Sequence, residues 1–131
     1  MSMRISRIEG LKFKTEYRGF EVITDVPIPI DHEPEGISPG ALMMAALGTC
    51  AGSRLVDQMN KRGWEVGDVE VTVKMRTNKE LRIATGFDLD IKLEADIAEE
   101  QREEIFEVAK LCFVANTLKD APEISYSLTL V

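Results

Sequence analysis

The chain has 131 residues, of which 44% are hydrophobic and 30% charged, a composition typical of one globular domain spanning residues 1–131. Its 16 Lys and Arg stand against 23 Asp and Glu, a net charge of -7 that argues against nucleic acid or an anionic membrane as a partner. No apolar stretch is long enough for a membrane helix, and the first residues do not resemble a signal peptide. We therefore expect a cytoplasmic protein, in which the 2 cysteines are reduced or transiently oxidised.

The N-terminal part predicts a small antiparallel meander. Residues 4–9 and 11–15 form short strands around Gly10, and residues 20–24 follow a turn at Tyr17–Gly19. Three prolines and several polar residues then interrupt any periodicity, so residues 26–37 are predicted to be a loop.

A helix is predicted from Ser38 to about Arg62. Ser38 can cap the free amides, and Pro39 is tolerated at the first helical position. The segment from Leu42 to Leu47 is apolar on nearly every side, and polar residues become frequent only after Cys50. The first half of this helix is therefore expected to be buried all round.

The rest of the chain predicts a hairpin, further helices and a last strand. Residues 69–75 and 87–94 alternate as strands, with residues 76–86 as their connection. An amphipathic helix at residues 98–110, a short helical turn to about Leu118 and a strand at residues 123–130 follow. This order indicates an α+β fold with antiparallel sheet over a central helix that carries Cys50.

The apolar helix also predicts a dimer. A helix that is apolar all round needs cover on both faces, and one small sheet readily covers only one. A second sheet from a partner chain would cover the other face, so we expect an obligate homodimer.

Cys50 and Cys112 are the residues most suited to chemistry, although either could be a small core residue. An unperturbed thiol of pKa about 8.5 is only about 3% ionised at pH 7, so a nucleophilic cysteine needs a nearby cation. Arg54 lies one turn after Cys50 on the same helix face, and Arg18 could reach it from the N-terminal turn. Cys112 begins a short helix and could resolve an oxidised Cys50.

Metal and cofactor chemistry have little support in the sequence. The only histidine, His32, lies in the loop, and there is no Cys-x-x-Cys pair, so we expect no metal site and no bound cofactor. His32 is more typical of a solvated loop residue than of a general base.

Two segments together resemble the OsmC/Ohr family of thiol-dependent hydroperoxide reductases. The residues that carry the resemblance are Ser38-Pro39, Leu42, Ala45-Ala46-Leu47-Gly48-Thr49-Cys50 and Cys112-Phe113-Val114-Ala115-Asn116-Thr117-Leu118. The resemblance spans the whole chain in order. It implies an α+β fold in which two chains intertwine, with sheets enclosing two central cysteine-bearing helices.

The resemblance also implies roles for individual residues. Cys50 corresponds to the peroxidatic cysteine, Cys112 to the resolving cysteine and Arg18 to the arginine that pairs with the thiolate. An external dithiol, free or in a protein, would reopen the disulfide. The hydroperoxidase branches usually carry a glutamate after the proline that begins the helix, whereas here Gly40 and Ala41 follow Pro39. Glu33 or Glu35 is the candidate replacement, and Phe113 stands where the family commonly has proline.

The leading hypothesis is a peroxidase that reduces organic hydroperoxides, with hydrogen peroxide as a second candidate, in defence against oxidative stress. Two alternatives remain at this point. One is a non-catalytic dimer of the same fold that binds an apolar small molecule, and the other is a redox sensor.

Overall fold

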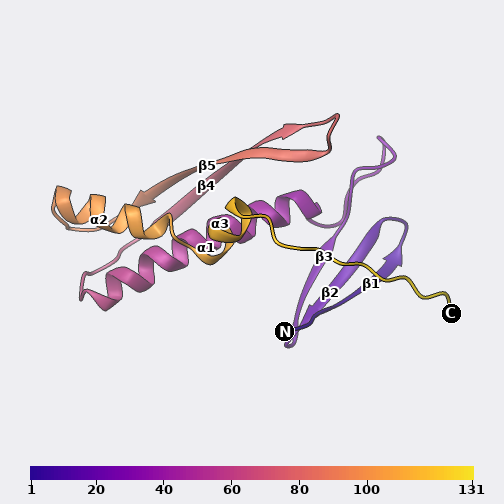
Figure 1. The fold of residues 1–131 in the computed structure, drawn as a ribbon, viewed down its shortest axis with the longest axis horizontal. Helices are drawn as coiled ribbons and strands as arrows, with labels where there is room; N and C mark the ends of the chain where they lie inside the picture. Colours follow the sequence, from indigo (N-terminus) through magenta and orange to yellow (C-terminus); the bar gives the residue numbers. More distant parts are fainter. The chain divides into compact units, whose positions relative to one another are not determined.

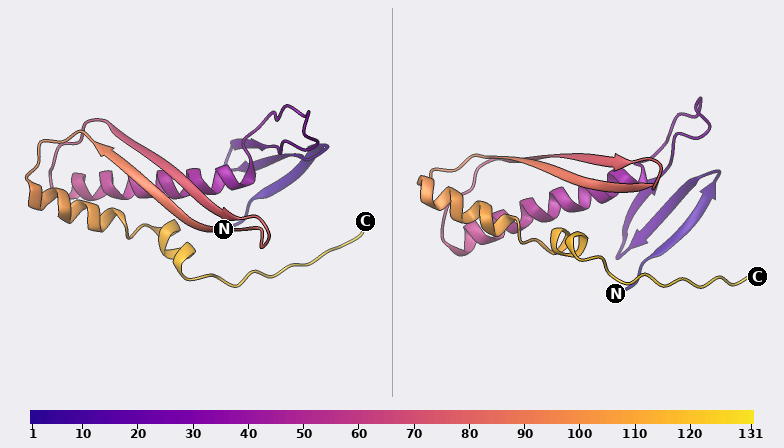
Figure 2. Two further views of the ribbon diagram at one scale, coloured as in Figure 1. Left: turned by 90° about the horizontal axis from the view of Figure 1, so that it is seen from above. Right: turned by 45° about the horizontal axis from the view of Figure 1, so that its top comes forward.

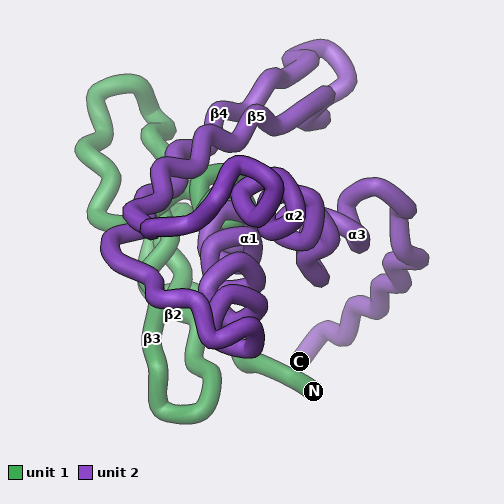
Figure 3. Tube along the Cα trace, turned by 90° about the vertical axis from the view of Figure 1, so that its left-hand side faces the viewer, with its two compact units in different colours: residues 1–45 green, residues 46–131 purple.

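The computed structural model describes residues 1–131 and contains both helices and antiparallel strands (Figure 1). This confirms the predicted α+β class. The chain forms two compact units, residues 1–45 and residues 46–131, which Figure 3 shows in green and purple. Each unit is described by itself below.

The first unit is built on a three-stranded antiparallel meander of β1 (Arg4–Glu9), β2 (Lys12–Tyr17) and β3 (Phe20–Thr24). The sequence predicted all three strands, although β2 continues two residues further than expected. Arg18 and Gly19 form the turn between β2 and β3, with φ of 50° and 85°. Positive φ at both turn residues suits the right-handed twist of the flanking strands.

The loop after β3 is organised by Asp25, which is 2% exposed. Its carboxylate accepts hydrogen bonds from the Val26 N–H at 2.8 Å, the Glu35 N–H at 3.0 Å and His32 Nε2 at 2.9 Å. A carboxylate can only accept, so Nε2 of His32 carries the proton in this bond. The loop predicted at residues 26–37 is confirmed. His32 stabilises it by donating a hydrogen bond to Asp25.

Acid is expected to weaken this loop through Asp25. The Glu35 N–H, then the His32 side chain, hold the pKa of Asp25 below its ordinary value, while burial opposes them. Because the folded-state pKa is the lower one, Asp25 stabilises the fold fully above the ordinary aspartate pKa. That stabilisation is lost as pH falls through the folded-state value.

Thermal unfolding of the wild type and Asp25→Asn across pH measures this effect. The wild type should have the higher Tm at pH 7, and the difference should shrink steadily below about pH 4. A difference in Tm that does not change with pH would show that the charge of Asp25 contributes nothing.

The second unit holds most of helix α1 (Pro39–Lys61) and a long hairpin of β4 (Val69–Asn78) and β5 (Ile83–Leu93). Ser38 Oγ accepts from the Ala41 N–H at 3.2 Å, as predicted for the helix cap. Figure 2 shows the hairpin running along α1. A Cβ at Gly48 would lie 2.9 Å from Cγ2 of Val73, so position 48 of α1 needs a glycine for the helix to lie this close to β4.

The hairpin is longer than the sequence predicted. Residues 76–86 were expected to be the connection, but the strands continue to Asn78 and resume at Ile83. The register shifts between Arg76 and Thr77, and such a bulge breaks the alternation on which the prediction depended. An ion pair between Arg76, in the part that was missed, and Asp88, in the predicted strand, bridges β4 and β5.

Two further helices pack on α1 and complete two hydrophobic clusters. Leu55 and Met59 of α1 pack with Ile105 and Ala109 of α2 (Glu99–Ala109). The second cluster consists of Leu47, Ala51 and Cys112, the residue just before α3 (Phe113–Lys119). None of the helices combines the length and apolar character needed to cross a lipid bilayer.

The strand predicted at residues 123–130 does not form in the single chain. Residues 121–131 have no regular secondary structure. A strand needs a neighbouring edge to satisfy its backbone, and neither sheet of this chain pairs with the segment. Its alternating apolar side chains are therefore left exposed: Ile124 by 68%, Tyr126 by 90%, Leu128 by 89% and Leu130 by 91%.

Candidate functional site

The structure brings the two cysteines together. Cys50 lies half-buried on α1, whereas Cys112 is 1% exposed. Cys50 packs against the cluster that contains Cys112, and its thiol is near enough to raise the pKa of Cys112. Both thiols are free. The sequence suggested a thiol pair, but spacing could not establish contact, and the fold supplies it.

Local structure explains how the thiols meet. Leu47 and Ala51 are one helical turn apart and face the cluster, with Cys50 beside them on the same helix. On the other side, α2 ends at Ala109, and Cys112 adopts an extended backbone with φ of -82° and ψ of 157°. The side chains that wall the cluster are Phe87 and Leu89 of β5 and Val114 and Ala115 of α3.

The environment keeps Cys112 protonated. Burial raises the pKa of its thiol, the Ala115 N–H that donates to Sγ at 3.4 Å lowers it, and the neighbouring Cys50 thiol raises it. The net effect is a raised pKa. Since thiolates are the attacking species, Cys112 is poorly suited to attack a substrate first and better suited to act second.

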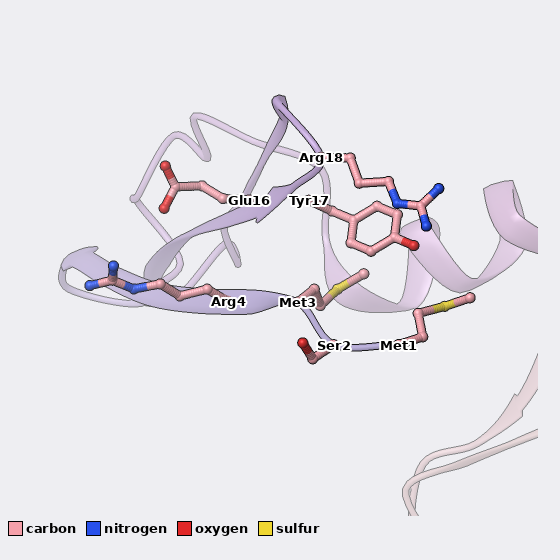
Figure 4. Close-up of a pocket in the computed structure, with 7 residues that line it drawn as sticks. All are labelled: Met1, Ser2, Met3, Arg4, Glu16, Tyr17 and Arg18. Carbon is pink, nitrogen blue, oxygen red and sulfur yellow. The ribbon is translucent and has the colours of Figure 1, made fainter.

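Arg18 lies in the first compact unit, whereas both thiols lie in the second. Its guanidinium carbon is 5.3 Å from the centre of the Tyr17 ring, and both side chains line a shallow pocket at the N-terminus. Figure 4 shows Arg18 and Tyr17 extending to the same side, with Glu16 pointing the other way. The predicted pairing of Arg18 with Cys50 stays a prediction.

The backbone of Arg18 is unusual for its residue type. Its φ of 50° lies in the left-handed region, which favours Gly, Asn and Asp. Such strain is found at functional sites, where a side chain is kept despite its cost to the backbone. Arg82, in the turn between β4 and β5, has a φ of 55°, so the backbone alone does not distinguish Arg18.

Glu35, one of the two candidate acidic replacements, is paired with a lysine. Glu35 binds Lys12 Nζ at 2.6 Å, and Lys12 also binds Glu9 at 3.1 Å. These residues and Arg18 all belong to the first unit, so within it Glu35 is held by Lys12 rather than by Arg18.

Arg54 is the second candidate cation, and it lies in the same unit as the thiols. Its Nε is buried and has no hydrogen-bond partner. Leaving a buried donor unpaired costs about 1–3 kcal/mol. Long helical side chains lean toward the preceding turn, which for Arg54 is the turn that carries Cys50.

One organising residue was missed by sequence reasoning. Asp25, directly after β3, holds the loop, and its signal was an acidic residue placed just before a proline-rich segment. The sequence singled out His32, but not the carboxylate to which it binds.

Comparison with known proteins identifies the family. The sequence profile of the OsmC-like protein family matches residues 32–127, well over half of the chain, including both cysteines. The chain belongs to the OsmC-like family. This confirms the resemblance drawn from the two cysteine segments. No curated protein matches the sequence significantly.

Solved structures of OsmC-like proteins share the fold. An OsmC-like protein from Mycoplasma pneumoniae is 14% identical with a TM-score of 0.77, covering 92% of this chain and 87% of that one. An organic hydroperoxide resistance protein from Legionella pneumophila is 18% identical with a TM-score of 0.59, covering 92% and 90%. One from Elizabethkingia anophelis is 18% identical with a TM-score of 0.60, covering 92% and 90%. At these identities the likeness concerns the fold.

Proposed function

We propose that this OsmC-like protein is a thiol-dependent peroxidase that reduces organic hydroperoxides. The observation that carries the proposal is the contact between Cys50 and Cys112 inside an apolar cluster. Two structural neighbours that bear the name organic hydroperoxide resistance protein support the choice of reaction.

The half-exposed Cys50 acts first. Its thiolate attacks the terminal oxygen of the hydroperoxide, the O–O bond breaks, and the alcohol leaves after taking up a proton. Cys50 is now a sulfenic acid. The Cys112 sulfur attacks the Cys50 sulfur, water leaves, and a disulfide joins the two residues. An external dithiol returns both thiols by exchange and becomes a disulfide itself.

The surroundings favour an organic substrate. The side chains around the thiols are aliphatic or aromatic, and burying the apolar part of a hydroperoxide against them is favourable by about 25 cal/mol per Å². Hydrogen peroxide has no apolar part and gains nothing from this contact.

A cation next to Cys50 would favour its thiolate and hold the peroxide oxygen. Arg18 is the first candidate because the OsmC/Ohr resemblance points to it, and its planar guanidinium can bind the thiolate and the peroxide oxygen together. Arg54 is the second, because its buried Nε has no acceptor and its helix position is one turn from Cys50.

The working unit in this proposal is a homodimer with one domain per chain. Two features motivate it: α1 begins with a segment that is apolar on nearly every side, and the C-terminal segment exposes one apolar face. A second copy of the chain would supply the missing strand neighbour for residues 123–130 and cover that face.

Sedimentation of two single variants tests the dimer. Leu128→Asp places a charge on the apolar face of the C-terminal segment and should weaken dimerisation at least about tenfold. Ser127→Asp is the matched control, since neighbouring residues of a strand face opposite sides, and it should leave the dimer intact. A monomeric wild type, or equal effects of both variants, would contradict the proposed interface.

Peroxide consumption tests the function. The purified protein with dithiothreitol should consume cumene hydroperoxide faster than hydrogen peroxide at equal concentration. A preference for hydrogen peroxide would overturn the substrate class.

A non-catalytic protein that binds an apolar ligand is the second candidate. Gly40 and Ala41 stand where an acidic residue would hold the arginine, and this departure favours the alternative. Consumption of neither peroxide, together with binding of the intact alcohol product of cumene hydroperoxide, would support it.

A further inference from the structure

Cys112 has a structural role in addition to the chemical one. Its Sγ accepts a hydrogen bond from the Ala115 N–H at 3.4 Å, and its carbonyl oxygen accepts from the Asn116 N–H at 2.9 Å. With its extended backbone, Cys112 is the N-cap of α3. The same sulfur therefore caps a helix and contacts Cys50.

Little else holds α3 in place. The helix has 7 residues, none of them buried, and Phe113 at its start is 81% exposed. Its packing comes from Val114 and Ala115, which lie against the cluster of Leu47, Ala51 and Cys112. Helices this short are unstable alone, so the order of α3 depends on its cap and on these two side chains.

The disulfide would alter that cap. A sulfur bonded to Cys50 takes its direction from the new bond and is no longer free to point at the Ala115 N–H. The covalent S–S bond is much stronger than the hydrogen bond from the Ala115 N–H to sulfur, which is a weak acceptor. The hydrogen bond of the cap is therefore the one that breaks. The two hydrogens lost from the thiols pass to the oxidant, which for a hydroperoxide gives alcohol and water.

Opening of α3 would serve the last step of the reaction. Thiol–disulfide exchange requires a reductant to reach sulfur, and Cys112 is 1% exposed while α3 is in place. We propose that closing the Cys50–Cys112 disulfide releases the cap of α3, and that α3 then loosens and admits the dithiol reductant. This proposal takes its oxidant, the hydroperoxide, and its reductant, the dithiol, from the proposed function. The release of α3 itself requires only that the Cys50–Cys112 disulfide forms.

A matched pair of substitutions at Asn116 tests the proposal without changing either cysteine. Asn116 is exposed on α3, and alanine favours a helix there while glycine disfavours it. The disulfide is first formed with diamide, a chemical oxidant, and its reduction by dithiothreitol is then timed. Asn116→Gly should be reduced faster than Asn116→Ala by roughly fivefold, with the wild type between them.

The same pair of substitutions at Asn60, exposed on α1, is the control and should leave the reduction rate unchanged. Equal rates for the two Asn116 variants would overturn the proposal, and so would failure of diamide to form the disulfide. Diamide replaces the peroxide in this experiment, so the two proposals can fail separately. If the protein consumes no peroxide but the Asn116 variants still differ, the proposed peroxidase function is refuted and the proposed release of α3 is retained.

Amide hydrogen exchange in residues 114–118 gives a second, direct measurement. Exchange should be roughly three- to tenfold faster in the oxidised wild type than in the reduced protein. Reduced Cys112→Ala, which has no cap, should resemble the oxidised wild type. Reduced Cys112→Ser, whose hydroxyl is a good cap, should be protected. Equal exchange in oxidised and reduced wild type would show that the cap does not respond to oxidation.

Discussion

Cys50→Ser is expected to lower peroxide consumption by roughly 10³-fold or more, because a serine hydroxyl cannot replace a thiolate as the nucleophile. Cys112→Ser should behave differently. Its Cys50 is intact, so one peroxide per chain is consumed rapidly, and Cys50 then remains as a sulfenic acid. Single-turnover measurement with stoichiometric cumene hydroperoxide distinguishes the two variants.

Both substitutions replace one sulfur atom by oxygen and change the size of the side chain equally. A difference between the two variants therefore reflects the different roles of the two cysteines. Serine at position 112 also keeps a side-chain acceptor for the Ala115 N–H, which preserves the start of α3. Full turnover in Cys50→Ser would remove the basis of the mechanism. Full steady-state turnover in Cys112→Ser would show that the dithiol reduces the sulfenic acid directly.

Arg18→Asn is expected to separate stability from activity. Asparagine tolerates the left-handed backbone at this turn better than arginine, so the variant should be more stable by up to about 1 kcal/mol. If Arg18 holds the thiolate and the peroxide oxygen, losing its charge should lower the rate roughly 10²-fold. Chemical denaturation and peroxide consumption of the same preparation measure both effects.

Arg18→Lys and Arg54→Gln complete the test. Lysine keeps a charge but not the planar pair of donors, so its activity should fall between those of the wild type and Arg18→Asn. Arg54→Gln removes the charge of the second candidate. A rate that falls in Arg54→Gln but not in Arg18→Asn would move the role to Arg54.

The sequence predicted the fold well where a pattern is local. The alternation of apolar and polar residues correctly predicted β4, and Ser38-Pro39 correctly predicted the start of α1. Both signals depend only on residues that are neighbours in the sequence. The hairpin length was missed since the shift between Arg76 and Thr77 breaks the alternation. The C-terminal strand was predicted from a sound pattern, but a strand also needs a neighbour, which this chain does not supply.

The candidate site was predictable only in part, for a similar reason. Both cysteines were found from their segments, but their contact depends on the way α2 returns the chain to α1. The raised pKa of Cys112 comes from burial and from a neighbour distant in sequence, so no local pattern contains it. The strain at Arg18 is a backbone property that residue types alone do not reveal.

The most direct test of the central claim is the intact mass of the protein after one equivalent of cumene hydroperoxide. The wild type should become lighter by two hydrogen atoms per chain, with Cys50 and Cys112 joined, and dithiothreitol should reverse the change. Cys112→Ser should instead become heavier by one oxygen atom. A wild type whose mass is unchanged, or which gains oxygen without forming the disulfide, would contradict the proposal that these two thiols act as a pair.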